Sequence, residues 1–367
     1  MWTRLKALIV KELLAVLRDP RGRVILVAPP LVQLLVFAFA ATLEVRNVDV
    51  AVLDQDAGRW SGELVHRLEG SPTFDEVIRV ESPSALRGLI DRQRVIAGLL
   101  IGPDFSRGIE GKGAADLQMI LDGRRSNTAQ IVVGYLTGIV EGLGADAAAR
   151  SDAAGVLVVP RNWFNPNLNF QWFMVPNLVA AIALMIGLIV TALSVARERE
   201  LGTFDQLMVS PLRTHEILIG KLVPPMLIGL FHITLYVAAA ILVFGVPLRG
   251  SLLSLYGSAL FFLAAVVGVG LFISALSSTQ QQAILGAFLF MVPAMLLSGF
   301  ATPIENMPEW LQPLTNLNPL RHFLVVVRGV FLKDLPVREV ASNTIPLALI
   351  AGATLSAAAW LFRRRLE

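Results

Sequence analysis

The sequence contains no cysteine and only four histidines in 367 residues. Without cysteine the chain has no disulfide, no thiol nucleophile and no zinc-finger ligand set. The histidines show no metal-ligand spacing; they are His66, His215, His232 and His322. We therefore expect no metal site and a fold that is stabilised by packing alone.

Charged residues are also scarce. They make up 16% of the chain, whereas 55% of the residues are hydrophobic. This balance excludes an ordinary soluble globular protein. Six runs are apolar and long enough to cross roughly 30 Å of hydrocarbon. They are Val24–Leu43, Trp172–Ala196, Leu222–Phe244, Leu255–Leu276, Ala283–Phe300 and Thr344–Phe362. The sequence thus predicts a polytopic α-helical protein with six transmembrane helices in a lipid bilayer.

The six runs contain no Asp, Glu, Lys or Arg. An ion-driven carrier needs titratable groups near the membrane midplane, so this absence disfavours that class. His232 is the one ionisable side chain in these runs. We expect it to be neutral and hydrogen-bonded to a neighbouring helix, with proton coupling as the alternative. The chain also lacks a G-x-x-x-x-G-K-[ST] loop, so we expect no ATP hydrolysis and no enzymatic activity of its own.

Basic residues are distributed unevenly among the short connections. If alternate connections lie on opposite sides of the membrane, one side carries 13 Lys and Arg residues and the other carries five. The richer side consists of residues 1–23, 197–221, 277–282 and 363–367. The positive-inside rule places this side, with both termini, in the cytoplasm. A net charge of +3 gives no indication of nucleic-acid binding.

Residues 1–23 precede the first run, at 24–43, and predict a separate helix. Their apolar residues recur at helical spacing and basic residues occupy the rest of the helix; the apolar positions are Trp2, Leu5, Ile9, Leu13 and Val16. This pattern is typical of an amphipathic helix that lies on the anionic cytoplasmic leaflet. A cleaved signal peptide is the alternative, but the apolar run that follows is too long for one.

Residues 44–171 change to short strands that alternate with helices. This pattern predicts a periplasmic α/β domain inserted between the first two transmembrane helices, with a mixed or parallel sheet covered by helices. The expected strands are Val48–Asp54, Glu76–Val80, Val95–Ile101 and Asp116–Asp122. Gly134, Gly138 and Gly142 recur every fourth residue in the last helix. That spacing permits close helix packing, either inside the domain or between subunits.

Residues 172–367 hold the other five runs and two long connections. The first connection, 197–221, reads RERELGTFDQLMVSPLRTHEILIGK. Gly202 and Thr203 should break the preceding helix, and Asp205–Val209 should form a short helix with an apolar face of Phe204, Leu207 and Met208. We expect this apolar face either to contact a partner protein or to lie on the bilayer surface. The second connection, 301–342, is expected to be a periplasmic loop in which Thr302–Phe323 forms short helices near the interface, re-entrant or not.

At these residues the sequence resembles a known family. The stretch RERELGTFDQLMVSPL closely resembles the signature loop of ABC-2 type exporter permeases. RLKALIVKELLAVLRDPRGR at the N-terminus, RNWFNPNLNFQWFMVP (161–176) and LSGFATPIENMPEWLQPLTNLNPLRHF (297–323) agree with the same family, so the resemblance covers nearly the whole chain. It implies a permease subunit of the bacterial inner membrane that pairs with a second permease subunit, identical or different.

The resemblance also implies partners. ATP and Mg would bind to a separate cytoplasmic ATPase subunit, with no cofactor in this chain, and relatives often work with a periplasmic adaptor and an outer-membrane channel. In this family the loop between the second and third spans carries a coupling helix that docks on the ATPase. The contact residues that the resemblance implies are Glu198, Glu200, Gly202, Thr203, Gln206, Leu207, Met208, Ser210 and Pro211.

The substrate path would run between the second and fifth helices of the two subunits, as the resemblance implies. The candidate residues are Asn177, Leu184, Met185, Leu188, Thr191, Phe288, Met291, Val292 and Met295. Their apolar, Met-rich character suits drugs or other amphiphilic compounds; the alternative is that they pack against neighbouring helices. An ATP-driven exporter is therefore the expected function. A non-transporting scaffold or receptor that displays its α/β domain is the alternative, which would have no use for a coupling loop.

Overall fold

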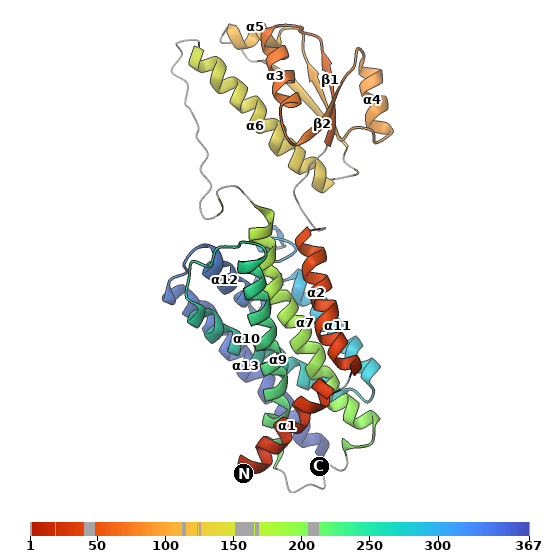
Figure 1. Ribbon diagram of the computed structural model, residues 1–367. Helices are drawn as coiled ribbons and strands as arrows, with labels where there is room; N and C mark the ends of the chain where they lie inside the picture. The colour runs from red at the N-terminus through yellow and green to blue at the C-terminus, as the bar shows by residue number, and fades with distance from the viewer. Residues whose placement is uncertain are drawn as a thin grey trace. The chain divides into compact units, whose positions relative to one another are not determined.

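The structure is a computed structural model that describes residues 2–18, 20–39, 48–111, 115–122, 124, 126–150, 165, 169–204 and 213–366. The chain forms two compact units, which are considered one at a time (Figure 1). One unit is Leu43–Arg161, and the other combines Met1–Thr42 with Asn162–Glu367. The first will be called the α/β unit and the second the membrane unit.

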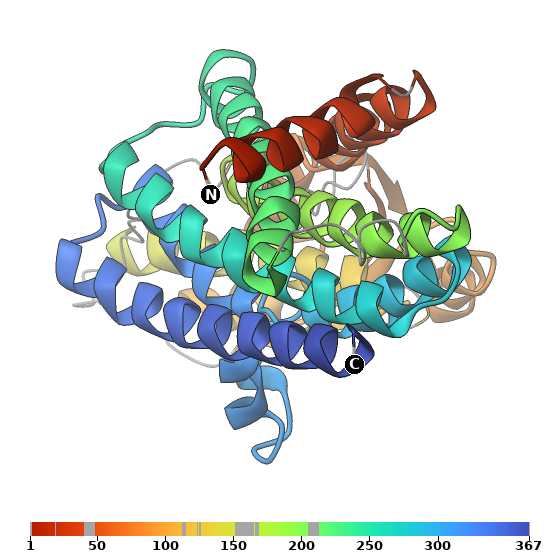
Figure 2. The ribbon, with the colours of Figure 1, turned by 90° about the horizontal axis from the view of Figure 1, so that it is seen from below.

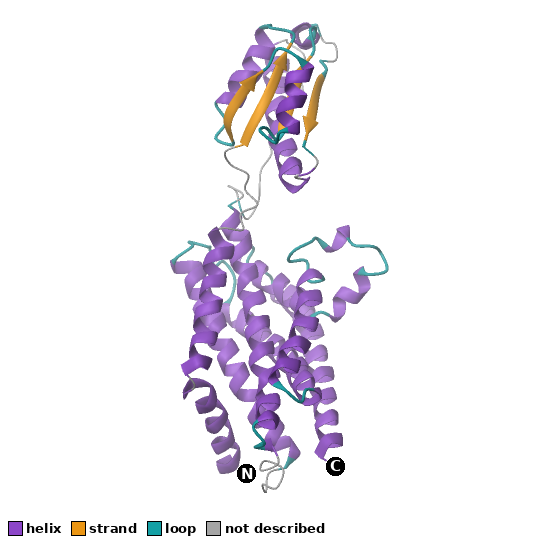
Figure 3. Cartoon of the chain, turned by 90° about the vertical axis from the view of Figure 1, so that its right-hand side faces the viewer, coloured by secondary structure: helices purple, strands orange, loops and turns teal. Residues whose placement is uncertain are grey.

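The α/β unit contains a four-stranded sheet with helices on both faces (Figure 3). Its elements are β1 (Val48–Asp54), α3 (Arg59–Glu69), β2 (Phe74–Arg79), α4 (Pro83–Asp91), β3 (Ala97–Ile101), α5 (Phe105–Glu110), β4 (Leu117–Leu121) and α6 (Ser126–Arg150). The strand order is β2-β1-β3-β4, with β1 parallel to β2 and β3, and β3 antiparallel to β4. The expected mixed sheet is confirmed, and β1 has the predicted bounds.

The position of β1 follows from its sequence. VDVAVLD is almost continuously apolar, as expected for a central strand with both faces covered. Val50 and Val52 face a core shared with α3, α5 and α6, whereas Ala51 and Leu53 face the residues of α4.

The glycines of α6 were expected to permit close packing, either inside the domain or between subunits. A Cβ on Gly142 would lie 3.7 Å from Nη1 of Arg67, which is an ordinary contact. A Cβ added at Gly134 or Gly138 would meet no atom within 4 Å, so neither glycine is needed for a close contact in the described part of this chain.

The described residues of the membrane unit form helices and the connections between them, with no β-strand. Its elements are α1 (Trp2–Arg18), α2 (Pro20–Phe39), α7 (Phe170–Glu200), α9 (Thr214–Leu242), α10 (Leu252–Leu276), α11 (Gln280–Leu296), η2 (Ile304–Asn306), η3 (Gln312–Leu317), α12 (Pro319–Leu332) and α13 (Val337–Leu366). Four of the described helices are long and apolar enough to cross a membrane: α7, α9, α10 and α13. Shorter apolar segments, Val27–Phe37 and Gln280–Leu296, lie in α2 and α11.

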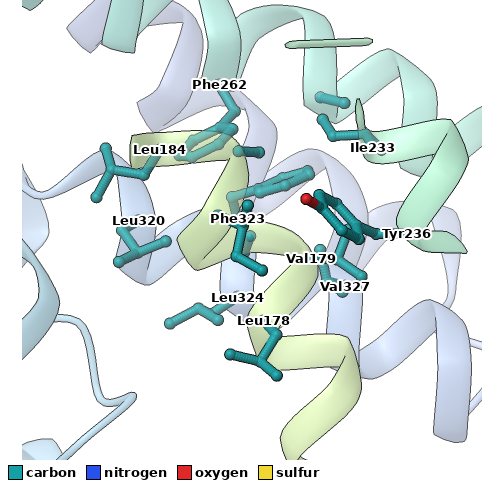
Figure 4. Packing of buried hydrophobic residues seen from close by; sticks show 14 of the residues in the cluster. Leu178, Val179, Leu184, Ile233, Tyr236, Phe262, Leu320, Phe323, Leu324 and Val327 are labelled. Atoms are coloured by element: carbon teal, nitrogen blue, oxygen red, sulfur yellow. The ribbon is translucent and has the colours of Figure 1, made fainter. Parts of the chain in front are cut away.

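The central helix of this unit is α7, which contacts α2, α9, α10, α11 and α12. Its residues are buried on all sides over most of its length. Beside it, the rings of Phe262 in α10 and Phe323 in α12 stack with centroids 4.3 Å apart (Figure 4). Tyr236 of α9 is fully buried in the same cluster. This packing joins three helices, α9, α10 and α12, around α7.

Residues 301–342 are more than the expected periplasmic loop. η2 and η3 are short 3-10 turns, but α12 is a helix buried in the bundle against α7, α10 and α13. Asn318 begins α12, with its side chain accepting a hydrogen bond from the Leu320 amide at 3.0 Å and Pro319 at the first helical position. Sequence patterns did not predict this buried helix. With only 14 residues, among them Arg321 and Arg328, α12 is too short and too polar to be recognised from its hydropathy as a membrane-embedded helix.

Proline lies inside most of the long helices. The positions are Pro29 and Pro30 in α2, Pro176 in α7, Pro224 and Pro225 in α9, Pro293 in α11 and Pro346 in α13. By contrast, α10 contains no proline and has glycines where neighbouring helices approach it. A Cβ on Gly270 would lie 2.7 Å from Cβ of Thr191 in α7, so the small residue permits this contact.

One end of the membrane unit brings together segments that are distant in the sequence. The start of α1, the end of α7 and the end of α13 lie at this end (Figures 1 and 2). Phe362 of α13 packs there with Val195 of α7 and Ala275 of α10. We call this the loop end of the unit, because α7 and α9 are connected there through residues 201–213.

Candidate functional site

The candidate coupling loop is described at its two ends. α7 ends at Glu200 and α9 begins at Thr214, while residues 205–212 lie outside the described part of the chain. Five of the expected contact residues fall in that gap: Gln206, Leu207, Met208, Ser210 and Pro211. The expected short helix at 205–209 also falls there and stays a prediction. The other expected contacts, at 198, 200, 202 and 203, can be placed.

The chain leaves α7 through a glycine turn. Gly202 has a φ of +70°, in the left-handed region that glycine adopts without strain, and this ends the helix. The amide of Thr203 donates to the carbonyl of Glu198 at 2.9 Å, which satisfies an acceptor of the last helical turn. The break expected at Gly202 and Thr203 is confirmed.

Phe204 differs from its expected role. It is 7% exposed and packs with Val195, Ala275 and Phe362, so its ring is not part of an exposed apolar face. Arg199 lies over this ring at 4.9 Å and donates to the carbonyl of Ala275 at 2.8 Å. The chain is thereby fixed against α10 just before residue 205.

Glu200 is held by the start of α11. Its Oε2 accepts hydrogen bonds from the amide of Gln280 at 2.9 Å and from its side-chain Nε2 at 3.2 Å. A carboxylate at a helix N-terminus is favourable because unpaired amides and the helix dipole are positive there. Glu200 therefore connects the end of α7 to α11.

Glu198 lies in a buried ion cluster rather than on an open surface. The Nζ of Lys221, whose side chain is 0% exposed, lies 2.7 Å from Oε2 of Glu198 and 3.3 Å from Oε1 of Glu12. The Nζ of Lys11 lies 3.1 Å from Oε1 of Glu198. The hydroxyl of Ser194 accepts a further hydrogen bond from Lys221 at 3.3 Å. These four charged residues, two cations and two carboxylates, will be called the ion cluster.

The ion cluster connects three helices. Lys11 and Glu12 belong to α1, Glu198 to the last turn of α7, and Lys221 to the third turn of α9. Burying a charge is costly unless it is paired, and here each charge has a partner of opposite sign. The two helices that enter and leave the candidate loop are thus joined to each other and to α1.

Apolar packing adds to this connection. Leu8 of α1 is 5% exposed and lies against Gly220 of α9, where a Cβ would come within 2.3 Å of the leucine Cδ2. Figure 2 shows α1 passing beside α9 at the loop end. The helix expected on the membrane surface is present, but part of its apolar face packs on the bundle. Sequence patterns alone did not predict that Lys11, Glu12 and Lys221 belong to this site.

The expected substrate-path residues all lie in the described parts of α7 and α11. On α7, Asn177, Leu184, Leu188 and Thr191 are fully buried, and Met185 packs partly buried against the same core. On α11, Met291 is buried and Met295 is partly buried, whereas Phe288 and Val292 are exposed at 46% and 50%. Within this chain the α7 residues pack in the core, whereas the α11 residues are divided between a buried and an exposed face. Their role in a path between two subunits stays a prediction.

A groove lies between α10 and α11, near the expected α11 residues. Its volume is about 520 Å³ and its lining is mainly apolar. The residues that line it are Val269, Phe272, Ile273, Leu276, Ser277, Gln282, Gly286, Leu289 and Phe290. None of the expected path residues belongs to this set, although Leu289 directly follows Phe288 in the sequence.

His232 is buried in α9, with Nδ1 2.8 Å from the carbonyl of Ile228 in the same helix. Its ring also lies beside Phe231 and Tyr236. A contact with a backbone carbonyl of its own helix and an aromatic environment suit a histidine that packs within the bundle. Proton coupling through this residue gains no support from these contacts.

Comparison with known proteins gives the family. A profile described as ABC-2 family transporter protein matches residues 24–360. This chain belongs to the ABC-2 transporter family. It is 45% identical over 366 residues to "Probable multidrug ABC transporter permease YbhR" of Escherichia coli K12, with 100% of both chains covered. The resemblance noted in the sequence is therefore confirmed, and the chain is a membrane protein of the permease type.

Two further relatives come from the same bacterium. The chain is 34% identical to "Probable multidrug ABC transporter permease YbhS", covering 100% of this chain and 98% of the relative. It is 28% identical to "Inner membrane transport permease YhhJ", covering 97% and 96%. The similarity to these relatives spans the residues of both compact units of this ABC-2 permease.

Proposed function

We propose that this chain is the transmembrane subunit of an ATP-driven exporter that moves drugs or other amphiphilic compounds out of the cytoplasm or inner membrane. A separate cytoplasmic ATPase subunit binds ATP and Mg, and a second permease subunit, identical or different, completes the assembly. A periplasmic adaptor and an outer-membrane channel are further partners. The names of the relatives at 45% and 34% identity, which include "multidrug", support this class of cargo.

The ion cluster is the observation that carries the proposal. A loop that transmits force must be attached firmly to the helices that move, and here both ends of residues 201–213 are joined by the Glu198–Lys221 pair. Exposed residues of a simple surface loop do not require a buried, charge-balanced anchor. In the proposed coupling mechanism, Gln206, Leu207 and Met208 contact the ATPase, and the Glu198–Lys221 pair attaches the loop to α7 and α9.

The proposed topology has six spans. α2 and α11 join the four helices that are long enough by themselves, and both carry exposed apolar residues, such as Val32 and Leu289. The loop end faces the cytoplasm, together with both termini, and the α/β unit lies in the periplasm. This arrangement agrees with the basic residues of α1 and of 363–365, which favour the cytoplasmic side. The membrane is the inner membrane of a bacterium.

The proposed cargo path uses the second chain. Phe288 and Val292 on α11 are exposed in one chain and would face the partner subunit or the lipid. Met291 and Met295 lie next to them on the same helix and can adapt to cargo of varied shape. The buried residues Leu184, Leu188 and Thr191 of α7 then support the path from behind rather than line it.

A double substitution tests the coupling role. Leu207→Asp with Met208→Asp puts two carboxylates where apolar side chains would enter an ATPase cleft, and burying an unpaired charge costs several kcal/mol. We expect the ATPase to detach, or to hydrolyse ATP without export of a fluorescent amphiphile. The measurements are copurification of the ATPase and export by the same cells, with the amount of permease in the membrane determined for each variant.

Leu201→Asp is the matched control. Leu201 is 64% exposed at the end of α7, outside the expected contacts, so a carboxylate there should leave both measurements unchanged. If the double variant also keeps wild-type copurification and export, the loop is not the coupling element. The alternative of a membrane scaffold, which needs no ATPase, would then account better for the chain.

A further inference from the structure

One face of α12 differs from the rest of this helix. Nearly all residues of α12 are buried in the bundle, from Pro319 to Phe331. The positions that are not buried are Arg321, Val325, Arg328 and Leu332. Their spacing of four, three and four residues places them in one stripe along the helix. A helix that is otherwise part of the core therefore directs two arginines to its single uncovered face.

Arg328 is held by neutral groups. Its Nε donates to Oδ1 of Asn177 in α7, and its Nη2 donates to the carbonyl of Gly299 at 2.9 Å. The guanidinium carbon lies 5.1 Å from the ring centroid of Phe173. These contacts fix the orientation of the guanidinium but supply no negative charge. Nη1 takes part in none of these hydrogen bonds.

Arg321 repeats this arrangement two turns earlier. Its Nη1 donates to the hydroxyl of Thr315 and lies 3.5 Å from the carbonyl of Gln312, both in η3. Within the described residues, no carboxylate lies within 4.0 Å of either arginine, whereas the lysines of the ion cluster each have one. The stripe therefore carries two positive charges that the described chain does not neutralise.

An uncompensated cation in a membrane bundle is costly and marks a functional position. Asn177 lies seven residues from the start of α7, which corresponds to about 10 Å along the helix axis. Since α7 runs from Phe170 to the loop end at Glu200, Arg328 lies near the opposite end. This depth is close to the boundary between hydrocarbon and headgroups, where anionic groups of amphiphiles are found.

Asn177 provides an independent indication of a ligand. It is 0% exposed, and its Nδ2 has no hydrogen-bond partner, although Oδ1 of the same amide accepts from Arg328. A buried amide donor without an acceptor is unfavourable by about 1–3 kcal/mol. An acceptor oxygen next to Arg328 would satisfy this donor and the guanidinium together.

We propose that Asn177 and Arg328, with Arg321 on the same stripe, bind the phosphate headgroup of an anionic amphiphile at the end of the membrane unit opposite the loop end. Arginine is well suited to phosphate because its planar fork donates parallel hydrogen bonds to two oxygens. Phe173 covers one face of the guanidinium, is itself 36% exposed and offers an apolar surface beside the headgroup. The ligand is either a resident phospholipid or a phosphate-bearing cargo. This site does not depend on ATPase coupling.

The test measures ligand-dependent stabilisation of the purified full-length chain in an uncharged maltoside detergent. The probes are dioleoyl phosphatidylglycerol, lauryl phosphate, inorganic phosphate and, as the neutral comparison, dioleoyl glycerol. We expect phosphatidylglycerol to raise the Tm of the wild type saturably, and the neutral lipid to do so little. Arg328→Gln should weaken the apparent affinity for phosphatidylglycerol at least tenfold, and Arg321→Gln should weaken it less.

Two controls separate binding from folding. Arg338→Gln removes an exposed arginine at the start of α13 and should keep wild-type affinity. Without lipid, Arg328→Gln should unfold at or above the wild-type temperature, because it removes an uncompensated charge. If Arg328 is only structural, this variant loses stability without lipid and keeps the same lipid-dependent shift, which would overturn the proposal.

The probes also distinguish the source of the ligand. Competition between lauryl phosphate and phosphatidylglycerol, lost in Arg328→Gln, indicates a site that accepts a single-chain cargo. Binding of phosphatidylglycerol alone indicates a resident lipid. Saturation by inorganic phosphate at the same concentration as by the amphiphiles would contradict an amphiphile site, as would equal shifts with dioleoyl glycerol.

Discussion

Lys221 and Glu198 meet across the base of the candidate coupling loop, with Nζ 2.7 Å from Oε2. The two residues are 23 positions apart in the sequence, yet they lie side by side on α9 and α7. Lys221 is fully buried and also contacts Glu12 of α1. The pair therefore determines how the two ends of the loop and the first helix are held together.

Removal of Lys221 should be strongly destabilising. Lys221→Met leaves Glu198 and Glu12 with Lys11 alone, and the loss of one partner from a buried ion pair costs about 3–5 kcal/mol. Adding Glu198→Gln should restore part of this loss, because the remaining Lys11 and Glu12 are again balanced. Thermal unfolding of the purified chain in detergent measures both variants. Lys333→Met, at an exposed pair with 3.4 Å separation, is the control and should cost only about 0–1 kcal/mol.

The contact between α1 and α9 predicts a specific disulfide. An ideal Cβ on Gly220 lies 3.4 Å from the Cβ of Leu8, close to the separation of about 3.5–4.5 Å found in disulfides. Because the chain has no cysteine of its own, Leu8→Cys with Gly220→Cys should crosslink in membranes under mild oxidation. Val10→Cys with Gly220→Cys is the control, since Val10 is 43% exposed. Efficient crosslinking of the control pair, or none of the first, would contradict the packing of α1 on α9.

The stack of Phe262 and Phe323 predicts that α12 belongs to the core. Phe323→Ala removes a 0% exposed ring and should cost about 3–5 kcal/mol of unfolding free energy. Val325→Ala, at a position 42% exposed on the same helix, should cost less than about 0.5 kcal/mol. Thermal unfolding with a common heating rate gives the comparison. Equal, small effects would mean that α12 is a peripheral loop helix.

Labelling of single cysteines tests the proposed orientation. Thr203→Cys and Arg364→Cys should react with an impermeant maleimide only after the cytoplasmic face is opened. Arg107→Cys, whose arginine side chain is 83% exposed in the α/β unit, should react in intact cells with a permeable outer membrane. The cysteine-free wild type gives the background. Reaction of Arg364→Cys from outside would reverse the topology.

The sequence predicted the local features of this fold better than the long-range ones. β1 was located correctly because five of its seven residues are apolar, four of them in succession at residues 50–53, which is typical of a buried strand. The helices α7, α9, α10 and α13 followed from hydropathy alone. The break at Gly202 followed from the chemistry of one residue. Each of these inferences needs only neighbours in the sequence.

The features that were missed depend on distant partners. The burial of Glu198 in an ion cluster could not be predicted, because its partners are 187 and 23 residues away in the sequence. Similarly, α12 looked like a loop because its arginines lowered the hydropathy, and its burial depends on α7 and α10. For the substrate path, helical spacing could not select a lining face on α7, because other helices cover that helix on nearly every side.

The two prolines of α9 give the loop end a mechanical property of its own. Proline has no amide hydrogen, so Pro224 and Pro225 cannot donate to the carbonyls of Gly220 and Lys221 four residues earlier. The backbone ladder of α9 is therefore interrupted directly after the residues that hold α1 and Glu198. Helices bend most easily where such hydrogen bonds are missing. We therefore expect α9 to bend at Pro224 and Pro225, between its ion-paired first turns and the part that packs against α10.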